Sequence, residues 1–199
     1  MWAPFAKQVF ISGTFTAGEK QPLTSEGDGY WFALIRNVEP GHQYKYIIET
    51  PDGRLLEKND PRARAITSSD KGFSVVVDNN FDWQNDANFA MPPRQDQVIY
   101  ELHVGTFNRP DAATSGTFDS AIEKLDYLRD LGINIIELMP ITSMAFSNGW
   151  GYAPNHIFSV ESMLGGRHGL MKFVRECHTR GIGVVLDVVY NHFYGDTDL

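Results

Sequence analysis

The sequence predicts two structural units: an all-β sandwich over residues 1–88 and a parallel α/β sheet over residues 97–199. In the first unit, short apolar runs are separated by turn-forming residues, which is typical of small sandwiches. In the second, the apolar period changes, and the order strand, helix, strand, helix, strand indicates parallel strands joined by right-handed crossovers. With 199 residues and 42% hydrophobic composition, the chain can bury a core and is not expected to be disordered.

The first unit is expected to contain strands over residues 9–11, 30–38, 44–49, 55–58 and 73–78. A turn is expected at Pro51-Asp-Gly53, because proline presets φ and glycine accepts a positive φ. Trp2 stands almost at the start with no strand before it. We therefore expect the first strand of this unit to be clipped.

The second unit is expected to contain strands over residues 98–104, 133–139 and 184–189, and helices over residues 118–131 and 170–180. Both helices carry apolar residues at steps of three and four, which gives each one buried face. Thr117 is expected to cap the first helix, and Gly132 to follow its last turn.

Polar and helix-breaking residues separate the two units, and we assign residues 89–96 as the linker. Aromatic side chains are interleaved in and before this linker, including Phe81, Trp83 and Phe89. We expect them to hold the segment against a neighbouring unit rather than to bind a ligand.

The third strand of the parallel sheet carries the strongest indication of a site. Asp187 interrupts an otherwise apolar run, and an unpaired carboxylate there would cost several kcal/mol. Asn191 and His192 follow, where ligand-binding residues of α/β folds collect. The alternative is a structural Asp187 bonded to backbone amides, with the Asn-His pair closing a turn.

The connection over residues 141–168 is longer than the roughly 2–6 residues usual between strand and helix. Long loops at the carboxyl ends of parallel strands commonly build sites. Trp150 and Tyr152 offer flat apolar faces that suit the C–H face of a sugar ring. They would equally serve to pack the loop down.

The formal net charge of −8 argues against nucleic acid or an anionic membrane as a partner, since both require clustered lysine and arginine. A neutral ligand fits better. The single cysteine, Cys177, excludes an internal disulfide and is expected to be a buried apolar residue. Neither a signal peptide nor a membrane helix is evident, so a soluble, cytoplasmic protein is expected.

Residues 187–192, Asp-Val-Val-Tyr-Asn-His, resemble the first signature region of glycoside hydrolase family 13, the α-amylase family. Residues 98–105 resemble its first barrel strand, residues 131–140 its second, and residues 150–152 the loop that follows. Residues 1–88 resemble a family 48 carbohydrate-binding module. The resemblance implies an immunoglobulin-like sandwich followed by the first three strands of an incomplete (β/α)8 TIM barrel.

The resemblance also implies roles for matched residues. Asp187, Asn191 and His192 would line the pocket for the sugar at the cleaved bond, Tyr152 would stack under it, and Trp150 belongs to the same loop. In α-amylases the position of Asn191 also binds calcium, but no metal or other cofactor is expected here. The implied partner is an α-glucan such as glycogen, starch or a maltooligosaccharide.

Two departures from the family pattern stand out. Leu164 replaces a tyrosine that usually precedes the second helix, so any contact of its hydroxyl is lost. The turn over residues 13–18 lacks the tryptophan usual in the module, which weakens the case that this module itself binds glucan.

The resemblance favours a retaining α-1,4-glucan branching enzyme, with isoamylase-type debranching and trehalose-releasing enzymes as alternatives. The family's nucleophile and acid/base come from later strands, beyond Leu199. Glu101 and Glu137 match neither and are interpreted as structural. We therefore expect a fragment that is inactive alone. A non-catalytic glucan-binding module is an alternative of another class. A nucleotide-binding domain is disfavoured because no Gly-x-Gly-x-x-Gly follows the first strand.

Overall fold

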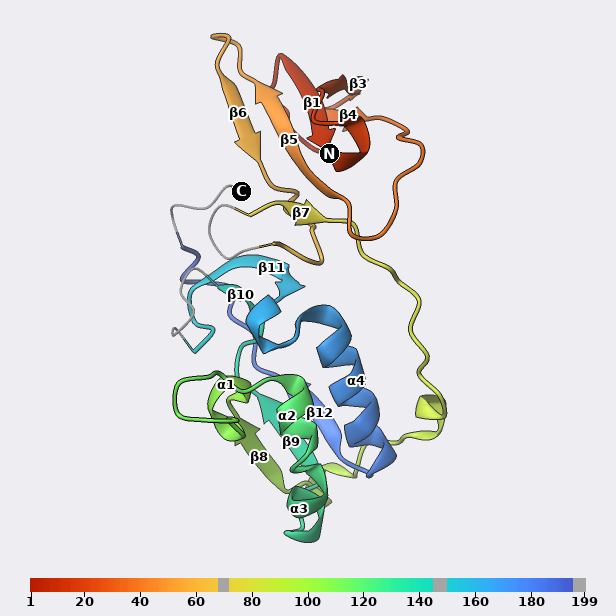
Figure 1. Ribbon diagram of the computed structural model, residues 1–199, viewed down its shortest axis with the longest axis vertical. Helices are drawn as coiled ribbons and strands as arrows, with labels where there is room; N and C mark the ends of the chain where they lie inside the picture. Colours follow the sequence, from red (N-terminus) through yellow and green to blue (C-terminus); the bar gives the residue numbers. More distant parts are fainter. Residues whose placement is uncertain (68–71, 145–149, 195–199) are drawn as a thin grey trace.

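The computed structural model describes residues 1–67, 72–144 and 150–194. These residues form two units joined by a long segment that runs beside helix α4 (Gly166–Thr179). Figure 1 shows the β-rich N-terminal unit at one end of the molecule and the α/β unit at the other. The two units predicted from the sequence are therefore present, in the predicted order.

An antiparallel sheet of order β2-β1-β5-β6 dominates the N-terminal unit, and β7 pairs with the start of β5. β3 and β4 form a second sheet, to which Trp2 adds a single bridge with Tyr30. Val9, Leu23 and Trp31 pack together as the unit's buried core. The strands are β1 (Gln8–Gly13), β2 (Gln21–Pro22), β3 (Thr24–Gly27), β4 (Tyr30–Phe32), β5 (Gln43–Glu49), β6 (Leu55–Lys58) and β7 (Ser74–Val75).

The turn between β5 and β6 has the predicted form. Gly53 adopts a φ of 85°, and its N–H donates to the carbonyl oxygen of Thr50 at 2.9 Å. Two expected strands are shorter than predicted: the one expected at residues 30–38 ends at Phe32, and the one at 73–78 is only two residues long. Apolar composition over-predicted their length, since Leu34 and Phe73 are 73% and 45% exposed and do not belong to the buried core.

The C-terminal unit contains a parallel sheet of order β12-β9-β8, as the strand–helix alternation predicts. Apolar side chains from the strands and helices form one buried core: Leu102, Val104, Phe118, Leu125, Leu128, Ile136, Leu138, Phe173, Cys177 and Ile182. The elements are β8 (Ile99–Leu102), α1 (Val104–Phe107), α2 (Phe118–Ile122), α3 (Leu125–Asp130), β9 (Ile135–Leu138), β10 (Thr142–Met144), β11 (Pro154–Val160), α4 and β12 (Gly183–Leu186).

The strands of this sheet end earlier than predicted, for one shared reason. Leu138, the last residue of β9, is the register partner of both Leu102 and Leu186. Beyond it the chain approaches Pro140, which has no N–H to continue a ladder. Because β9 lies between β8 and β12, both outer strands lose their partner where β9 ends, and they end here too. The sequence prediction that strands continue to residues 104 and 189 was therefore wrong.

The helix predicted over residues 118–131 is broken into α2 and α3 between Glu123 and Lys124. Its buried face survives the break, because both helices still direct apolar side chains into the core. The hydroxyl of Thr117 accepts from the N–H of Ser120 at 3.2 Å, which confirms the predicted cap. Gly132 follows with a φ of 94°.

The segment before β8 packs along α4. Phe89 stacks on the ring of His178 with centroids 3.9 Å apart, and Asp86 bonds the same ring at 2.6 Å. Arg175 lies 5.3 Å above the ring of Phe81 and donates to the carbonyl oxygen of Asp82. These contacts confirm that aromatic side chains hold the segment against the neighbouring unit.

Candidate functional site

The carboxyl ends of the three parallel strands bring two polar side chains into one row, on either side of a methionine. Because Leu102, Leu138 and Leu186 are register partners, the residues that follow them lie side by side: His103, Met139 and Asp187. The N–H of Asp187 donates to the carbonyl oxygen of Leu138 at 2.9 Å, which fixes the backbone there. Such a strand end is where β/α barrels place their chemistry.

The hydroxyl of Tyr152 donates to Oδ2 of Asp187 at 2.8 Å. Asp187 is thus bonded to a side chain from the long connection, not to the backbone amides of the alternative interpretation. The bond, followed by burial and the charges of Asp187, Glu101 and Glu137, raises the pKa of Tyr152. Tyr152 as a whole residue remains 40% exposed, so it is accessible to a ligand.

The Trp-Gly-Tyr segment is held in place by its central glycine. Gly151 has a φ of 86° and lies directly against the end of β9, where a Cβ would collide with the carbonyl oxygen of Pro140. Only glycine permits both this conformation and this approach. The close contact carries Trp150 and Tyr152 over the strand ends, and Trp150 is 61% exposed there.

The long connection has structure of its own. β10 and β11 pair as an antiparallel hairpin with irregular register. Glu161, buried after β11, accepts from the backbone N–H groups of Met144 and Met163 at 3.3 and 3.1 Å. Residues 145–149, which were expected to belong to this glycine-rich and aromatic loop, lie outside the described residues.

Asn191 and His192 lie in an irregular segment, five and six residues beyond the end of β12, instead of directly after the strand. Both are exposed, and His192 has a φ of 56°. Within the described residues, neither side chain bonds to Tyr152 or Asp187. The segment is attached at Tyr194, whose N–H donates to the carbonyl oxygen of Pro154 at 3.2 Å.

The sequence analysis did not select His103, which lies in the same row as Asp187. Its ring centroid is 6.3 Å from that of Trp150, and its Nδ1 is 3.0 Å from Oγ1 of Thr106. Partial burial lowers its pKa. The available signal was a polar residue at the end of an apolar strand, the same signal that identified Asp187.

Glu101 and Glu137 are register partners on β8 and β9, beside Val185 of β12. They occupy the row before His103 and Asp187, deeper along the strands. Catalytic groups in β/α barrels lie at the carboxyl ends of the strands. Glu101 and Glu137 are the penultimate residues of β8 and β9, and their structural interpretation stays a prediction.

Two further residues singled out in the sequence, Cys177 and Leu164, lie in the buried core. Cys177 is fully buried in the core, and this burial raises the pKa of its thiol, as expected for an inert apolar residue. Leu164, one of the two departures from the family pattern, is also buried in this core.

Across residues 1–67, 72–144 and 150–194, no group of three or more histidine, cysteine, aspartate or glutamate side chains could hold a metal ion. No helix in the same part of the chain is long and apolar enough to cross a membrane.

The fold defines a class: a β-sandwich module joined to part of a β/α barrel, with the Tyr152–Asp187 pair at its strand ends. Sequence comparison assigns the parts. Residues 101–198 match the alpha amylase catalytic domain, and residues 1–63 match carbohydrate-binding module 48, the isoamylase N-terminal domain. The chain belongs to the α-amylase family, glycoside hydrolase family 13.

Characterised relatives include a malto-oligosyltrehalose trehalohydrolase from Saccharolobus solfataricus, 36% identical over 96% of this chain and 32% of the relative. The 1,4-alpha-glucan branching enzyme GlgB from Bacillus caldolyticus is 37% identical over 98% of this chain and 31% of its own length. The chain thus spans about a third of the length of these relatives.

Solved structures also resemble this chain over part of their own length. A protein from Salmonella typhimurium described as an alpha amylase superposes with a TM-score of 0.85 at 33% identity, over 99% of this chain and 32% of the other. The GBS pullulanase SAP, solved in complex with maltotetraose, gives a TM-score of 0.80 at 27% identity, over 96% of this chain and 31% of the other. The matched share again is about a third of each longer protein.

Proposed function

We propose that this chain supplies the N-terminal module and part of the sugar-binding face of an α-glucan-active enzyme. The observation that carries the proposal is the Tyr152–Asp187 hydrogen bond at the carboxyl ends of the parallel strands. The ring of Tyr152 provides a flat face for a glucose unit, and the free oxygen of Asp187 can accept from a sugar hydroxyl. Relatives named as glucan-active enzymes support this substrate class.

We assign the remaining sequence-predicted residues to the same site as a proposal. Trp150 would extend the aromatic surface on one side of Tyr152. Asn191 and His192 would line the opposite side once the segment that carries them closes over the strand ends. Because both are exposed and without a bond to Tyr152 or Asp187, this arrangement requires a rearrangement on binding sugar.

Among the activities of the family, we propose α-1,4-glucan branching. The enzyme would cleave an α-1,4 bond, hold the glycosyl group covalently, and pass it to a sugar 6-hydroxyl. Retention requires two carboxyl groups about 5–5.5 Å apart, a nucleophile and an acid/base. Asp187 is bonded to Tyr152, and Glu101 and Glu137 lie deeper along the strands, so we assign neither role to these residues.

Product analysis distinguishes the activities. The complete protein is incubated separately with amylose, pullulan and a maltooligosyltrehalose, and its products are identified by proton NMR. New α-1,6 linkages from amylose support branching, whereas linear chains from pullulan or free trehalose support the two alternatives. We predict no turnover by the 199-residue chain alone. A rate of roughly 1–1000 per second from this chain would contradict that prediction.

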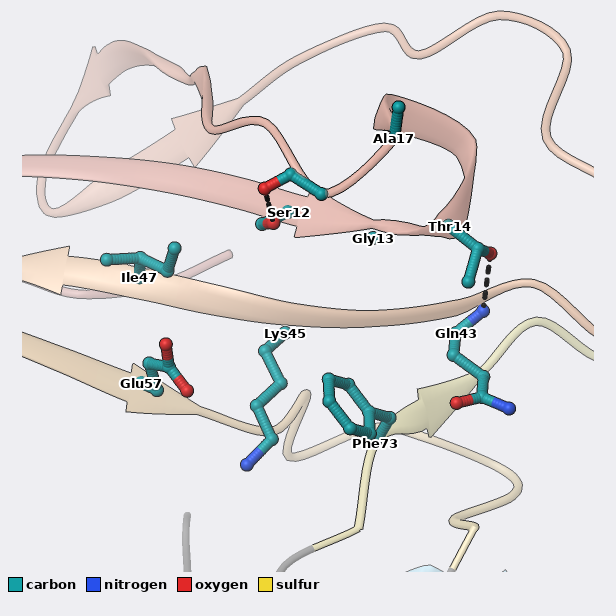
Figure 2. A pocket seen from close by; sticks show the side chains of 10 residues that line it. Ser12, Gly13, Thr14, Ala17, Gln43, Lys45, Ile47, Glu57 and Phe73 are labelled. Carbon is teal, nitrogen blue, oxygen red and sulfur yellow. Dashed lines mark hydrogen bonds between the residues drawn. The ribbon is translucent and has the colours of Figure 1, made fainter.

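A second candidate function, glucan binding by the N-terminal module itself, is favoured by a hollow of about 460 Å³ on the β5 face. Figure 2 shows Lys45 and Phe73 beside each other at this hollow, with Ile47 and Glu57 farther along the same face. Apolar and polar groups in one hollow suit the two kinds of surface of a sugar ring. Retention on amylopectin that Phe73→Ala abolishes would support this function.

We place the boundary of the module near residue 88 and the start of the barrel near residue 97. The strand pairings of the two units fall on either side of these boundaries, since β7 ends at Val75 and β8 begins at Ile99. The cytoplasmic location expected from the sequence stays a prediction.

A further inference from the structure

His103 lies at the carboxyl end of β8, in the row that holds Asp187. We propose that His103 is a neutral sugar-binding residue whose Nε2 accepts a hydrogen bond from a hydroxyl group of the bound glucan. The inference rests on the proposed function, because it adds one residue to the same site. It further specifies the ligand as an uncharged, hydroxyl-rich molecule.

The position of the ring follows from strand alternation. Glu101 and His103 are two residues apart, so their side chains extend from the same face of the sheet. On that face, β9 carries Glu137 and β12 carries Asp187. The ring lies 6.3 Å from that of Trp150, on the side of the aromatic segment. Gly105 leaves room for it, since a Cβ there would lie 3.1 Å from Cε1 of His103.

The tautomer follows from the hydrogen bonds of Thr106. Its hydroxyl has one proton, and Oγ1 lies 3.4 Å from the carbonyl oxygen of His103, which can only accept. We assign this proton to the carbonyl oxygen, so that Oγ1 accepts from Nδ1 of His103 at 3.0 Å. With the proton on Nδ1, Nε2 presents a lone pair. Burial, which lowers the pKa of His103, keeps the ring neutral near pH 7.

The charges around the ring select the ligand. Asp187, Glu101 and Glu137 contribute negative charge on the same face, so an anionic sugar would be repelled. A neutral glucose unit donates hydroxyl protons, which both Nε2 of His103 and the free oxygen of Asp187 can accept. The two acceptors lie in one row at the strand ends, with Met139 between them.

The test uses the 199-residue chain labelled with 15N at histidine. Long-range proton–nitrogen NMR reports whether Nδ1 or Nε2 carries the proton, before and after maltoheptaose is added. We expect an unprotonated Nε2 whose signal shifts on binding, as an acceptor nitrogen must. Thr106→Val removes the group that fixes the tautomer, so we expect a mixture of both tautomers in that variant.

Binding measurements on variants complete the test. We expect His103→Ala to weaken maltoheptaose binding about tenfold, from the loss of one buried hydrogen bond. His103→Gln, whose amide oxygen can accept, should recover part of this loss. The labelled wild-type chain gives its answer even if a variant fails to fold.

The measurements separate a failure of the role proposed for His103 from a failure of the proposed function. A proton on Nε2, or an unshifted Nε2 signal in a chain that binds maltoheptaose through Tyr152, overturns the role of His103 and leaves the proposed function intact. If maltoheptaose does not bind at all, the proposed site and the role of His103 both fall.

Discussion

The hydroxyl of Tyr152 and Oδ2 of Asp187 are 2.8 Å apart, and this bond joins the long connection to the end of β12. The two residues are separated by 35 positions in the sequence, so only the fold brings them together. Within the described residues, Tyr152 provides the one side-chain hydrogen bond to the Asp187 carboxylate, and Tyr152 is itself 40% exposed. This combination supports the proposed site for a neutral sugar.

The effect of Asp187 on the ionisation of Tyr152 is directly measurable. The hydrogen bond to Asp187 is the largest cause of the raised pKa of Tyr152. We expect Asp187→Asn to lower this pKa toward the ordinary value of 10.0. Alkaline ultraviolet titration measures it, with Tyr152→Phe subtracted to isolate one tyrosine among several. An unchanged Tyr152 titration in Asp187→Asn would mean that the bond is absent in solution.

The close approach of Gly151 to Pro140 predicts that substitution of Gly151 by alanine is unusually destabilising. We expect Gly151→Ala to cost about 3 kcal/mol or more, because backbone strain and a steric collision add. Gly132→Ala is the matched control, since Gly132 also has a positive φ but meets nothing within 4 Å. It should cost only about 1 kcal/mol. Equal denaturant midpoints for the two variants would refute the role of the contact.

The contacts of His178 with Asp86 and Phe89 predict that the segment before β8 is rigid. We expect His178→Ala to increase the rate of proteolytic cleavage within residues 84–90 about fivefold, corresponding to roughly 1 kcal/mol of lost local stability. His178→Phe separates the two contacts, because it keeps a ring to stack on Phe89 and removes the bond to Asp86. If His178→Ala is cleaved at the wild-type rate, residues other than His178 hold the segment before β8 in place.

The N-terminal module should resist alkaline pH until its tyrosines ionise. Burial, followed by the charge of Asp60, raises the pKa of Tyr46 to about 12, and Tyr44 is raised by burial and by its 2.7 Å bond to Asp60. Both folded pKa values exceed the unfolded value. The neutral hydroxyls therefore contribute full stability below pH 10, and this contribution is lost as the pH rises through the folded values.

Denaturant unfolding at a series of pH values tests this account. Tyr44→Phe should lose about 1–2 kcal/mol at neutral pH, from its hydrogen bond to a charged group. It should also show a weaker decline in stability above pH 10 than the wild-type chain. A decline as steep as that of the wild-type chain would contradict the assignment to Tyr44.

The fold was predictable where sequence period and turn chemistry agree. Thr117 and Gly132 marked the ends of a helical region because capping depends on local backbone geometry. The ends of β8 and β12 were not predictable in this way. Apolar composition continues to Val189, but the ladder stops where the central strand approaches Pro140. Strand length is thus set by a neighbour that is distant in the sequence.

The site was partly predictable for the same reason. Asp187 stood out because a carboxylate is costly in an apolar strand, and Tyr152 because of its aromatic loop. Their hydrogen bond depends on Gly151 packing against Pro140, which no local pattern reveals. His103 was missed because its ring is fixed by Thr106 and reaches the row of Asp187, with Met139 between them, only through strand register.

The most direct test of the central claim is maltoheptaose binding by this chain, measured by NMR titration in parallel with Tyr152→Ala and Phe73→Ala. If the strand ends form an α-glucan site, Tyr152→Ala abolishes the shifts of the residues around Asp187, and Phe73→Ala leaves them unchanged. If binding survives in Tyr152→Ala and is lost in Phe73→Ala, the glucan is held by the N-terminal module, and the site proposed at the strand ends is wrong.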